Sequence, residues 1–405
     1  MFLCAPAHAG APSDTVIVLD SSGSMQQNDP RFRAHLAAQI YADVIDDVDA
    51  LAILSMDPGS IVVHELARSG PSREDAKRRI RKLAASGGTH CVEALSEALD
   101  QLATRGRRDA VPSIVFLSDG ECPETARDGR TTADVLATAA ANNVRIFSIG
   151  LGKKASSGES AAYLERLAVA TQGHHYSAAQ AEELPGIFAQ IFGRTRGTRA
   201  YELEFEPGSR PFTIEPYVST AAIVLTPEEG GTADVDGLRT PSGGTATVAL
   251  VRDKNRKGLP YVVAKVRYPD AGSWTLDSTG DRRVHMAVIQ TFGLDVSLDP
   301  LPDNVPTGAP VVVVGRVTDE HGQPIDDKFG GEIDFELSCR GPGDKGYKKL
   351  GKLGHRGGGE YQLPLDVDDP GKYACFGRAR RGSTLDATTP SVRTLGERMD
   401  AKLDL

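Results

Sequence analysis

The sequence contains no apolar run of roughly 18 residues, the length that a membrane-spanning helix requires. Basic residues are not in excess either: 46 Lys and Arg face 55 Asp and Glu, so the formal net charge is −9. This balance argues against a nucleic-acid partner. A Gly-x-x-x-x-Gly-Lys phosphate loop is also missing, so any ATPase working with this protein is expected to be a separate chain.

Short oxygen-bearing residues follow two apolar runs near the start of the chain. The run at 16–19 ends on Asp20-Ser21-Ser22-Gly23-Ser24, and the run at 114–117 ends on Ser118-Asp119-Gly120. A third polar segment, Ser86-Gly87-Gly88-Thr89, lies between them. The carboxyl ends of adjacent parallel strands meet at one edge of a sheet, where ligands bind. We therefore expect the five side chains with oxygen donors to form one site: Asp20, Ser22, Ser24, Thr89 and Asp119.

This pattern resembles the von Willebrand factor type A (VWA) domain and its metal-ion-dependent adhesion site (MIDAS). The family pattern is Asp-x-Ser-x-Ser, then a distant Thr, then a distant Asp that is usually followed by Gly, and this chain matches each element in order. An alternative interpretation is that the first segment merely caps a helix. The resemblance implies a divalent metal, Mg²⁺ first, with Ca²⁺ or Mn²⁺ as alternatives.

By the same resemblance, the Ser22 and Ser24 hydroxyls bind the metal directly, and Thr89 binds it directly or through water. Asp20 and Asp119 then hold ordered waters and the serine hydroxyls. One coordination position is left for an Asp or Glu of a partner protein, which makes this protein ligand the expected partner.

Two further residues are expected at the rim of the site. Glu121 adds negative charge there, favours Ca²⁺ or repels wrong partners, or else is simply a solvated loop residue. His90, beside Thr89, is a rim candidate or an ordinary loop residue, because no second His stands at metal-binding spacing.

Cysteine is scarce, with five in 405 residues, and Cys4 lies in the N-terminal segment. The other four form two plausible pairs. Cys91 closely follows Thr89 and Cys122 closely follows Asp119, so these two meet if the site assembles. Cys339 and Cys375 lie on alternating strands and point into one core. Two disulfides, Cys91–Cys122 and Cys339–Cys375, are predicted, with buried free thiols as the alternative.

The N-terminal segment ends in Ala7-His8-Ala9, which fits the small-x-small cleavage pattern of a secretory signal. Residues 1–12 are interpreted as a signal remnant, with a disordered terminus as the alternative. Together with the cysteine pairs, this predicts an exported protein that is periplasmic, secreted or on the cell surface. The charged final residues, 395–405, could lead to an anchor beyond the end of this chain.

Residues 13–196 alternate strand and helix patterns, which is typical of a doubly wound, Rossmann-like α/β domain. Strands are expected at 15–19, 51–56, 60–66, 113–117, 145–149 and 174–177. Helices are expected at 32–48, 72–83, 91–104, 132–142, 161–170 and 181–192. The Asp57-Pro58-Gly59 turn indicates a hairpin, so the third strand is expected at an antiparallel edge. The basic run 77–82 is interpreted as a solvated helix face or a surface for an acidic partner.

After residue 196, short alternating runs separated by turns predict two all-β, sandwich-like domains, at 197–292 and 293–395, with a tail at 396–405. Trp274, the only tryptophan, is the expected core anchor of the first. In the second, Tyr373 stands two residues before Cys375, which resembles the tyrosine corner of immunoglobulin-like sandwiches. The tryptophan of antibody domains is absent, so only an Ig-like sandwich is predicted.

These features favour an exported, non-enzymatic adhesion or assembly module. The alternative is a VWA adaptor subunit of an ATPase-driven, chelatase-like assembly. A third hypothesis, a metal-dependent hydrolase with Asp20 as nucleophile, is disfavoured because such phosphatases carry a second Asp where this chain has Ser22.

Overall fold

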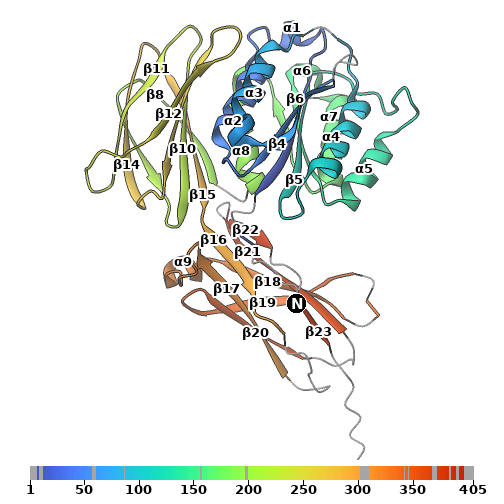
Figure 1. Cartoon of the computed structure of the whole chain (residues 1–405), viewed down its shortest axis with the longest axis vertical. Helices are drawn as coiled ribbons and strands as arrows, with labels where there is room; N and C mark the ends of the chain where they lie inside the picture. The colour runs from blue at the N-terminus through green and yellow to red at the C-terminus, as the bar shows by residue number, and fades with distance from the viewer. Residues whose placement is uncertain are drawn as a thin grey trace, which may run out of the picture.

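The computed structural model of the chain describes residues 7–8, 12–56, 61–85, 87–155, 157–196, 199–301, 310–341, 343–344, 346–366, 372–382, 385–388 and 392–395. Within them lie an α/β domain and two groups of antiparallel strands (Figure 1). The α/β domain and the first group of strands stand side by side in Figure 1, and the second group lies below them.

The N-terminal domain is built on a sheet with the order β4-β3-β2-β5-β6-β7. Its strands are β2 Ser13–Leu19, β3 Ala50–Ser55, β4 Val62–Arg68, β5 Val111–Ser118, β6 Arg145–Leu151 and β7 His175–Ala178. All neighbours pair in parallel except β3 and β4, which are antiparallel. The predicted α/β fold and antiparallel edge strand are therefore confirmed, whereas the predicted 57–59 turn lies outside the described residues.

Helices cover both faces of this sheet. They are α1 Met25–Asn28, α2 Arg33–Val44, α3 Ser69–Lys82, α4 Cys91–Arg105, α5 Thr132–Ala141, α6 Gly152–Ala155, α7 Gly158–Ala170, the 3-10 turn η1 Ala181–Glu183 and α8 Leu184–Arg196. Alternate residues of β2 point to opposite faces. Ile17 packs in the core beneath α2 and α8, while Val16 packs in the core beneath α4 and α7.

Helix α2 ends earlier than the sequence pattern predicts. We expected it to reach residue 48, but it ends at Val44, because Ile45 is extended with ψ of 153°. The Asp49 carboxylate then accepts hydrogen bonds from the backbone of Asp46 and of Ser13, both at 2.8 Å. These local bonds satisfy backbone groups in a turn that a longer helix would abolish.

The β-sandwich domain follows, with a five-stranded sheet β12-β13-β10-β15-β8 and a three-stranded sheet β11-β14-β9. Its strands are β8 Arg199–Phe205, β9 Ser209–Ile214, β10 Val218–Pro227, β11 Ala233–Arg239, β12 Ala249–Lys254, β13 Pro260–Arg267, β14 Gly272–Gly280 and β15 Val284–Phe292. Trp274 is a core anchor as predicted: it is buried, and its indole N–H donates to the carbonyl of Asp270 at 2.8 Å.

The outer face of the five-stranded sheet is buried against the N-terminal domain. Ile223 on β10 points into the sandwich core, while its neighbours Ala222 and Val224 pack in the same apolar cluster as Leu36 and Ile40 of α2. The two domains therefore share one hydrophobic core rather than being joined only by a linker.

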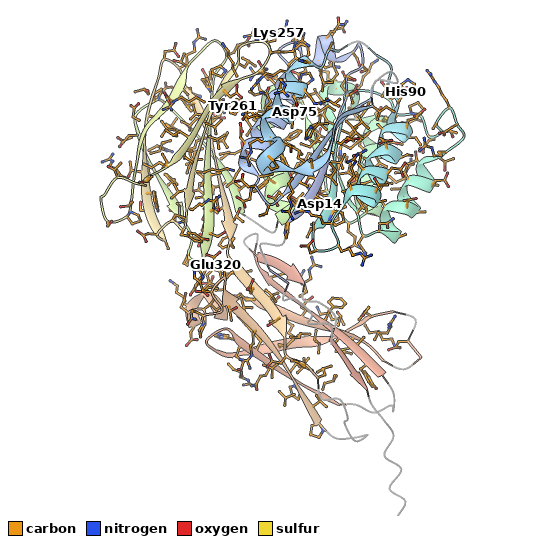
Figure 2. All side chains as sticks on the ribbon, in the orientation of Figure 1. Asp14, Asp75, His90, Lys257, Tyr261 and Glu320 are labelled. Atoms are coloured by element: carbon orange, nitrogen blue, oxygen red, sulfur yellow. A yellow bond between two sulfur atoms is a disulfide. The ribbon has the colours of Figure 1, made fainter. Side chains whose placement is uncertain are left out.

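A buried cluster of charges reinforces this shared interface. Lys77 of α3 is 1% exposed, and its ammonium lies 3.0 Å from carboxylate oxygens of Asp43 on α2 and Asp253 on β12. The Tyr261 hydroxyl on β13 donates to Asp43 Oδ2 at 2.7 Å, an oxygen that the Lys77 ammonium also contacts. Figure 2 shows Tyr261 at the junction of the two domains.

The interpretation of the basic run 77–82 as a solvated face is therefore wrong for its first residue and for Ile80, which is fully buried. Lys77 faces inward because Asp43 and Asp253 surround it. The acidic partner that the run meets belongs to the same chain.

The C-terminal domain has one continuous strand order, β1-β16-β17-β20-β19-β18-β21-β22, with β23 also paired to β21. The elements are β16 Leu294–Leu298, β17 Pro310–Asp319, α9 Asp327–Gly331, β18 Asp334–Arg340, β19 Lys348–Gly357, β20 Glu360–Asp366, β21 Lys372–Arg381, β22 Leu385–Thr388 and β23 Val392–Leu395. The two-residue strand β1, Ala7–His8, pairs with β16, although the sequence pattern predicts that these residues belong to a signal remnant.

The disulfide Cys339–Cys375 links β18 to β21, where the two cysteines stand directly opposite each other in the same sheet. Both side chains are buried in the core, as the alternating pattern predicts. In antibody domains the equivalent bridge crosses between two sheets. The tyrosine-corner resemblance therefore does not extend to the position of this bridge.

Candidate metal site

The carboxyl ends of β2 and β5 bring the two motif aspartates together. The strands are parallel neighbours in register, with Val18 opposite Phe116, so Asp20 and Asp119 emerge at the same edge of the sheet. Both carboxylates are buried, each residue being 1% exposed. This is the end of the domain at which α1 lies in Figure 1.

Asp20 is held in place through both of its carboxylate oxygens. Oδ1 accepts the backbone N–H of Ser22 at 2.8 Å, and Oδ2 accepts the hydroxyl of Ser118 at 2.9 Å. The backbone N–H of Asp119 also points at Oδ2, at 3.3 Å. Asp20 thus fixes the turn that presents Ser22 and, at the same time, the end of β5.

Asp119 is bonded in the same way by the first motif segment. The Ser24 hydroxyl donates to Oδ1 at 2.7 Å, and the Asn28 amide donates to Oδ2 at 2.9 Å. The Ser22 and Ser24 hydroxyls lie 2.9 Å apart. These contacts join four of the five predicted site residues in one network.

Thr89 reaches the site from the loop before α4. It is half-buried and lines a hollow of about 900 Å³ together with Ser24 and Asp119. The loop is tied to the first segment by a backbone hydrogen bond from Gly23 N–H to the carbonyl of Gly87 at 3.2 Å. All three sequence segments of the predicted site therefore meet at this edge of the sheet.

The two rim candidates have different positions. Glu121 is exposed and lines the same hollow. His90 stands at the N-terminus of α4, and its Nδ1 lies 3.6 Å from a carboxylate oxygen of Glu93. His90 is not among the described residues that line the hollow.

The electrostatics of the site suit a hard divalent cation. Burial, and then the charge of Asp119, raise the pKa of Asp20, because a second negative charge in a buried site is costly. Besides backbone N–H groups and the Asn28 amide, the donors around the two carboxylates are the hydroxyls of Ser24 and Ser118. Hydroxyl oxygen belongs to the ligand type that Mg²⁺ and Ca²⁺ prefer. A cation placed here would compensate the repulsion between the two aspartates.

Two residues of the network, Ser118 and Asn28, were not selected from the sequence. Ser118 was visible as the residue before Asp119, at the last position of β5. Asn28 follows Ser24 by one helical turn, and residues four apart share a helix face. This spacing is the only sequence feature that points to Asn28 as a site residue. The structure adds that α1 lies beside Asp119, so that Asn28 can bond to it.

The predicted disulfide Cys91–Cys122 is present beside the site, with the two Cα atoms 5.6 Å apart. Cys91 opens α4, just after Thr89, and Cys122 follows Asp119 by three positions. The bridge therefore ties the Thr89 loop to the loop after β5 and limits how far these two sides of the site can separate.

Comparison with known families identifies the N-terminal fold. Residues 15–121 match the von Willebrand factor type A domain. The matched segment contains all five predicted site residues, the whole of β5 and all but the first two residues of β2. The N-terminal domain is a VWA domain.

Three solved structures are similar in fold to half or more of this chain or to nearly half of it. One is a von Willebrand factor type A protein from Catenulispora acidiphila, with 19% identity and a TM-score of 0.39 over 89% of this chain and 67% of that chain. Another is proximal thread matrix protein 1 from the mussel byssus, with 16% identity and a TM-score of 0.39 over 49% of both chains.

A third is the pilus adhesin SpaC from Lactobacillus rhamnosus GG, with 9% identity and a TM-score of 0.40 over 95% of this chain and 56% of that chain. The chain thus spans about two thirds of the first structure and about half of the other two. No curated protein matches the sequence.

Beyond the matched segment, β6, β7 and α8 complete the six-stranded sheet of the VWA domain and its helical layers. In the part of the chain that the structure describes, no helix is both long and apolar enough to cross a membrane.

Proposed function

We propose that the VWA domain binds a divalent metal, Mg²⁺ first and Ca²⁺ or Mn²⁺ as alternatives, and through it an Asp or Glu of a partner protein. The observation that supports this most directly is the Asp20–Ser22–Ser24–Asp119 network beside Thr89, at the mouth of a solvent-open hollow. A complete MIDAS would need the same five oxygen-bearing side chains.

In this proposal the three hydroxyl groups of Ser22, Ser24 and Thr89 are the side-chain ligands. Asp20 and Asp119 orient them, since both carboxylates already accept hydrogen bonds from serine or backbone donors of this network. Bound there, a cation with mostly neutral ligands keeps much of its charge and attracts a carboxylate at the open side. Ser24 and Thr89 line that open side.

The protein acts in this proposal as a non-enzymatic adhesion or assembly module. The hollow is open and near the upper end of the size range of small-ligand pockets, about 300–1,000 Å³. That shape suits a protruding segment of another protein. The shared core between the VWA domain and the β-sandwich domain supports the view that the sandwich holds the binding domain in a set orientation.

We further propose that the protein is exported. Two disulfides, one in the VWA domain and one in the C-terminal domain, support an oxidising compartment. They favour the adhesion module over an ATPase adaptor, which would work in a reducing cytosol.

A pull-down from the source organism tests the function. The wild-type protein is expected to retain a partner in Mg²⁺ and to release it in EDTA, and Asp119→Ala is expected to retain nothing in either buffer. Asp128→Ala is the matched control, because Asp128 is an exposed aspartate in the loop after β5 that pairs with Arg130. Equal retention with and without metal would contradict the proposal, as would retention by Asp119→Ala.

A further inference from the structure

The hollow beside the metal site is larger than one carboxylate side chain requires. Its volume is about 900 Å³, and its wall extends from Ser24 and Thr89 to α6 and to Glu229, which lies between β10 and β11 of the β-sandwich domain. A partner that enters at the metal site must therefore meet further side chains, and their charges determine which neighbouring residues the partner can carry.

Two of the cations in this wall are already neutralised within the chain. The Arg31 guanidinium lies 3.1 Å from a carboxylate oxygen of Glu229. The Arg33 guanidinium lies 3.0 Å from a carboxylate oxygen of Glu182. Asp29, which lines the same hollow, accepts the backbone N–H groups of Arg33 and Ala34 at the start of α2. The two ion pairs therefore add no net positive charge that could attract an acidic partner.

Lys153 and Lys154 are different. Both are exposed residues of α6 that line the hollow, and among the described residues no carboxylate lies within ion-pair distance of either ammonium group. Two positive charges on one wall of a binding hollow are thus left without a counter-charge.

Helix α6 lies close to the metal site. Gly152, its first residue, has φ of +79°, and a Cβ at that position would come within 3.3 Å of the Asn28 amide oxygen. The amide nitrogen of the same Asn28 donates to Asp119 at 2.9 Å. One side chain therefore separates the start of α6 from the carboxylate of the site, and Lys153 and Lys154 follow directly.

We propose that the partner is a polypeptide segment with at least two acidic residues. One binds the metal at the site formed by Ser24, Thr89 and Asp119, and another lies against Lys153 and Lys154. This inference rests on the proposed metal-dependent function. Glu121 restricts where the second acidic residue of the partner can lie. It is exposed and lines the same hollow without an ion pair among the described residues. It repels an acidic group on its own side, whereas the two lysines attract one on theirs.

Selection from a random dodecapeptide library displayed on phage tests the inference. Peptides are captured by the full-length protein in Mg²⁺ and eluted with EDTA, and their sequences are read. We expect the wild-type protein to select peptides with two or more acidic residues at a recurring spacing. Replacing the second acidic residue in a synthetic copy should weaken binding by about two- to fivefold, the scale of one exposed charge pair.

The variant that isolates the two lysines is Lys153→Ser/Lys154→Ser. It should still capture peptides in a metal-dependent way, but the preference for a second acidic residue should be lost. Lys82→Ser/Lys328→Ser is the matched control, because it removes the same charge from exposed positions on α3 and α9, away from the hollow. The control should select the same peptides as the wild type.

The outcomes separate the two levels of the proposal. Metal-dependent peptides with a single acidic residue, equally bound by wild type and the lysine variant, would overturn the inference and leave the metal-dependent function standing. Peptides that elute without regard to metal, or a library that yields no metal-dependent binder, would overturn both.

Discussion

The Ser24 hydroxyl donates a hydrogen bond of 2.7 Å to Asp119, a residue 95 positions further along the chain. Ser24 stands at the start of α1 and Asp119 directly after β5, so this one bond closes the candidate site across the edge of the sheet. The bond also occupies Asp119 Oδ1, while Asn28 occupies Oδ2. Both carboxylate oxygens of Asp119 thus accept hydrogen bonds from other side chains, which supports its proposed role of orienting the metal ligands.

Divalent metal is expected to stabilise the VWA domain. Mg²⁺ at 100 times its Kd should add about 2.7 kcal/mol to the free energy of unfolding, because only the folded chain assembles the site. Thermal unfolding in Mg²⁺ and in EDTA measures this, and Asp20→Ala should remove the difference. If the wild-type protein melts at the same temperature in both buffers, the metal site does not exist.

Asn28→Ala is expected to weaken metal binding without removing it. The amide holds Asp119 from one side, and the loss of such an orienting group typically costs ten- to a hundredfold in metal affinity. Calorimetric titration with Mg²⁺ measures the change. Gln27→Ala, in the same short helix and outside the hydrogen-bond network, serves as the control; equal affinities for the two variants would show that Asn28 does not position Asp119.

Lys77→Ala is expected to destabilise the protein strongly, by about 3–5 kcal/mol, because it leaves the buried Asp43 carboxylate without its cation. Lys82→Ala on the same helix should cost less than about 0.5 kcal/mol, since Lys82 is exposed. Urea unfolding followed by tryptophan fluorescence reports on the β-sandwich domain through Trp274. Similar midpoints for the two variants would mean that the buried cluster does not hold the domains together.

Each disulfide is expected to stabilise its own domain. The bridges close segments of 31 and 36 residues, which corresponds to about 3–4 kcal/mol each in the chain-entropy description. Peptide mapping without reductant, on protein from the exported fraction, should recover Cys91 linked to Cys122 and Cys339 linked to Cys375. Free thiols at all four positions would contradict both the pairing and the proposed export.

Acid is expected to destabilise the protein through His35 on α2. Burial, with a smaller contribution from the charge of Arg256, lowers the pKa of His35 to about 3, against about 6.5 in the unfolded chain. Between these values the unfolded chain binds more protons, so the stabilising contribution is complete above pH 6.5 and is lost as the pH falls toward 3.

The slope for this single group is about 1.4 kcal/mol per pH unit at most. His35→Gln removes it. Burial raises the pKa of Asp29 to about 6 and gives the opposite dependence, but Asp29 titrates in both proteins and cancels when the two are compared. The difference between the unfolding free energies of wild type and variant should therefore change with pH between 6.5 and 3, and parallel curves would reject the assignment to His35.

The α/β domain was predictable from sequence because its signals are local. Two apolar runs are followed by aspartates, and strand ends in a parallel sheet share one edge, so the sequence alone predicts that Asp20 and Asp119 lie together. In α4, Val92, Leu95, Leu99 and Leu102 recur at helical spacing, which predicts a single buried face, and all four are buried.

Local signals misplaced features that depend on distant partners. Helix α2 ends at Val44 because Asp49 holds the following turn. The basic run on α3 looked solvated from its composition, yet Lys77 is buried because Asp253, far along the chain in β12, lies beside it. A charged residue is buried only where its partners are brought to it, and that information is not carried by the neighbouring sequence.

The sequence by itself predicted the donor set of the candidate site, the strands that present it and the two cysteine pairs. These predictions came from strand periodicity, from motifs at strand ends and from the resemblance to the VWA domain. Only the tertiary structure shows that Asn28 donates a hydrogen bond to Asp119 and that α6 places Lys153 and Lys154 on the wall of the same hollow. It also shows that the VWA and β-sandwich domains share one core. These relationships join residues far apart in sequence, and they arise from the packing of whole elements against one another, which no local pattern encodes.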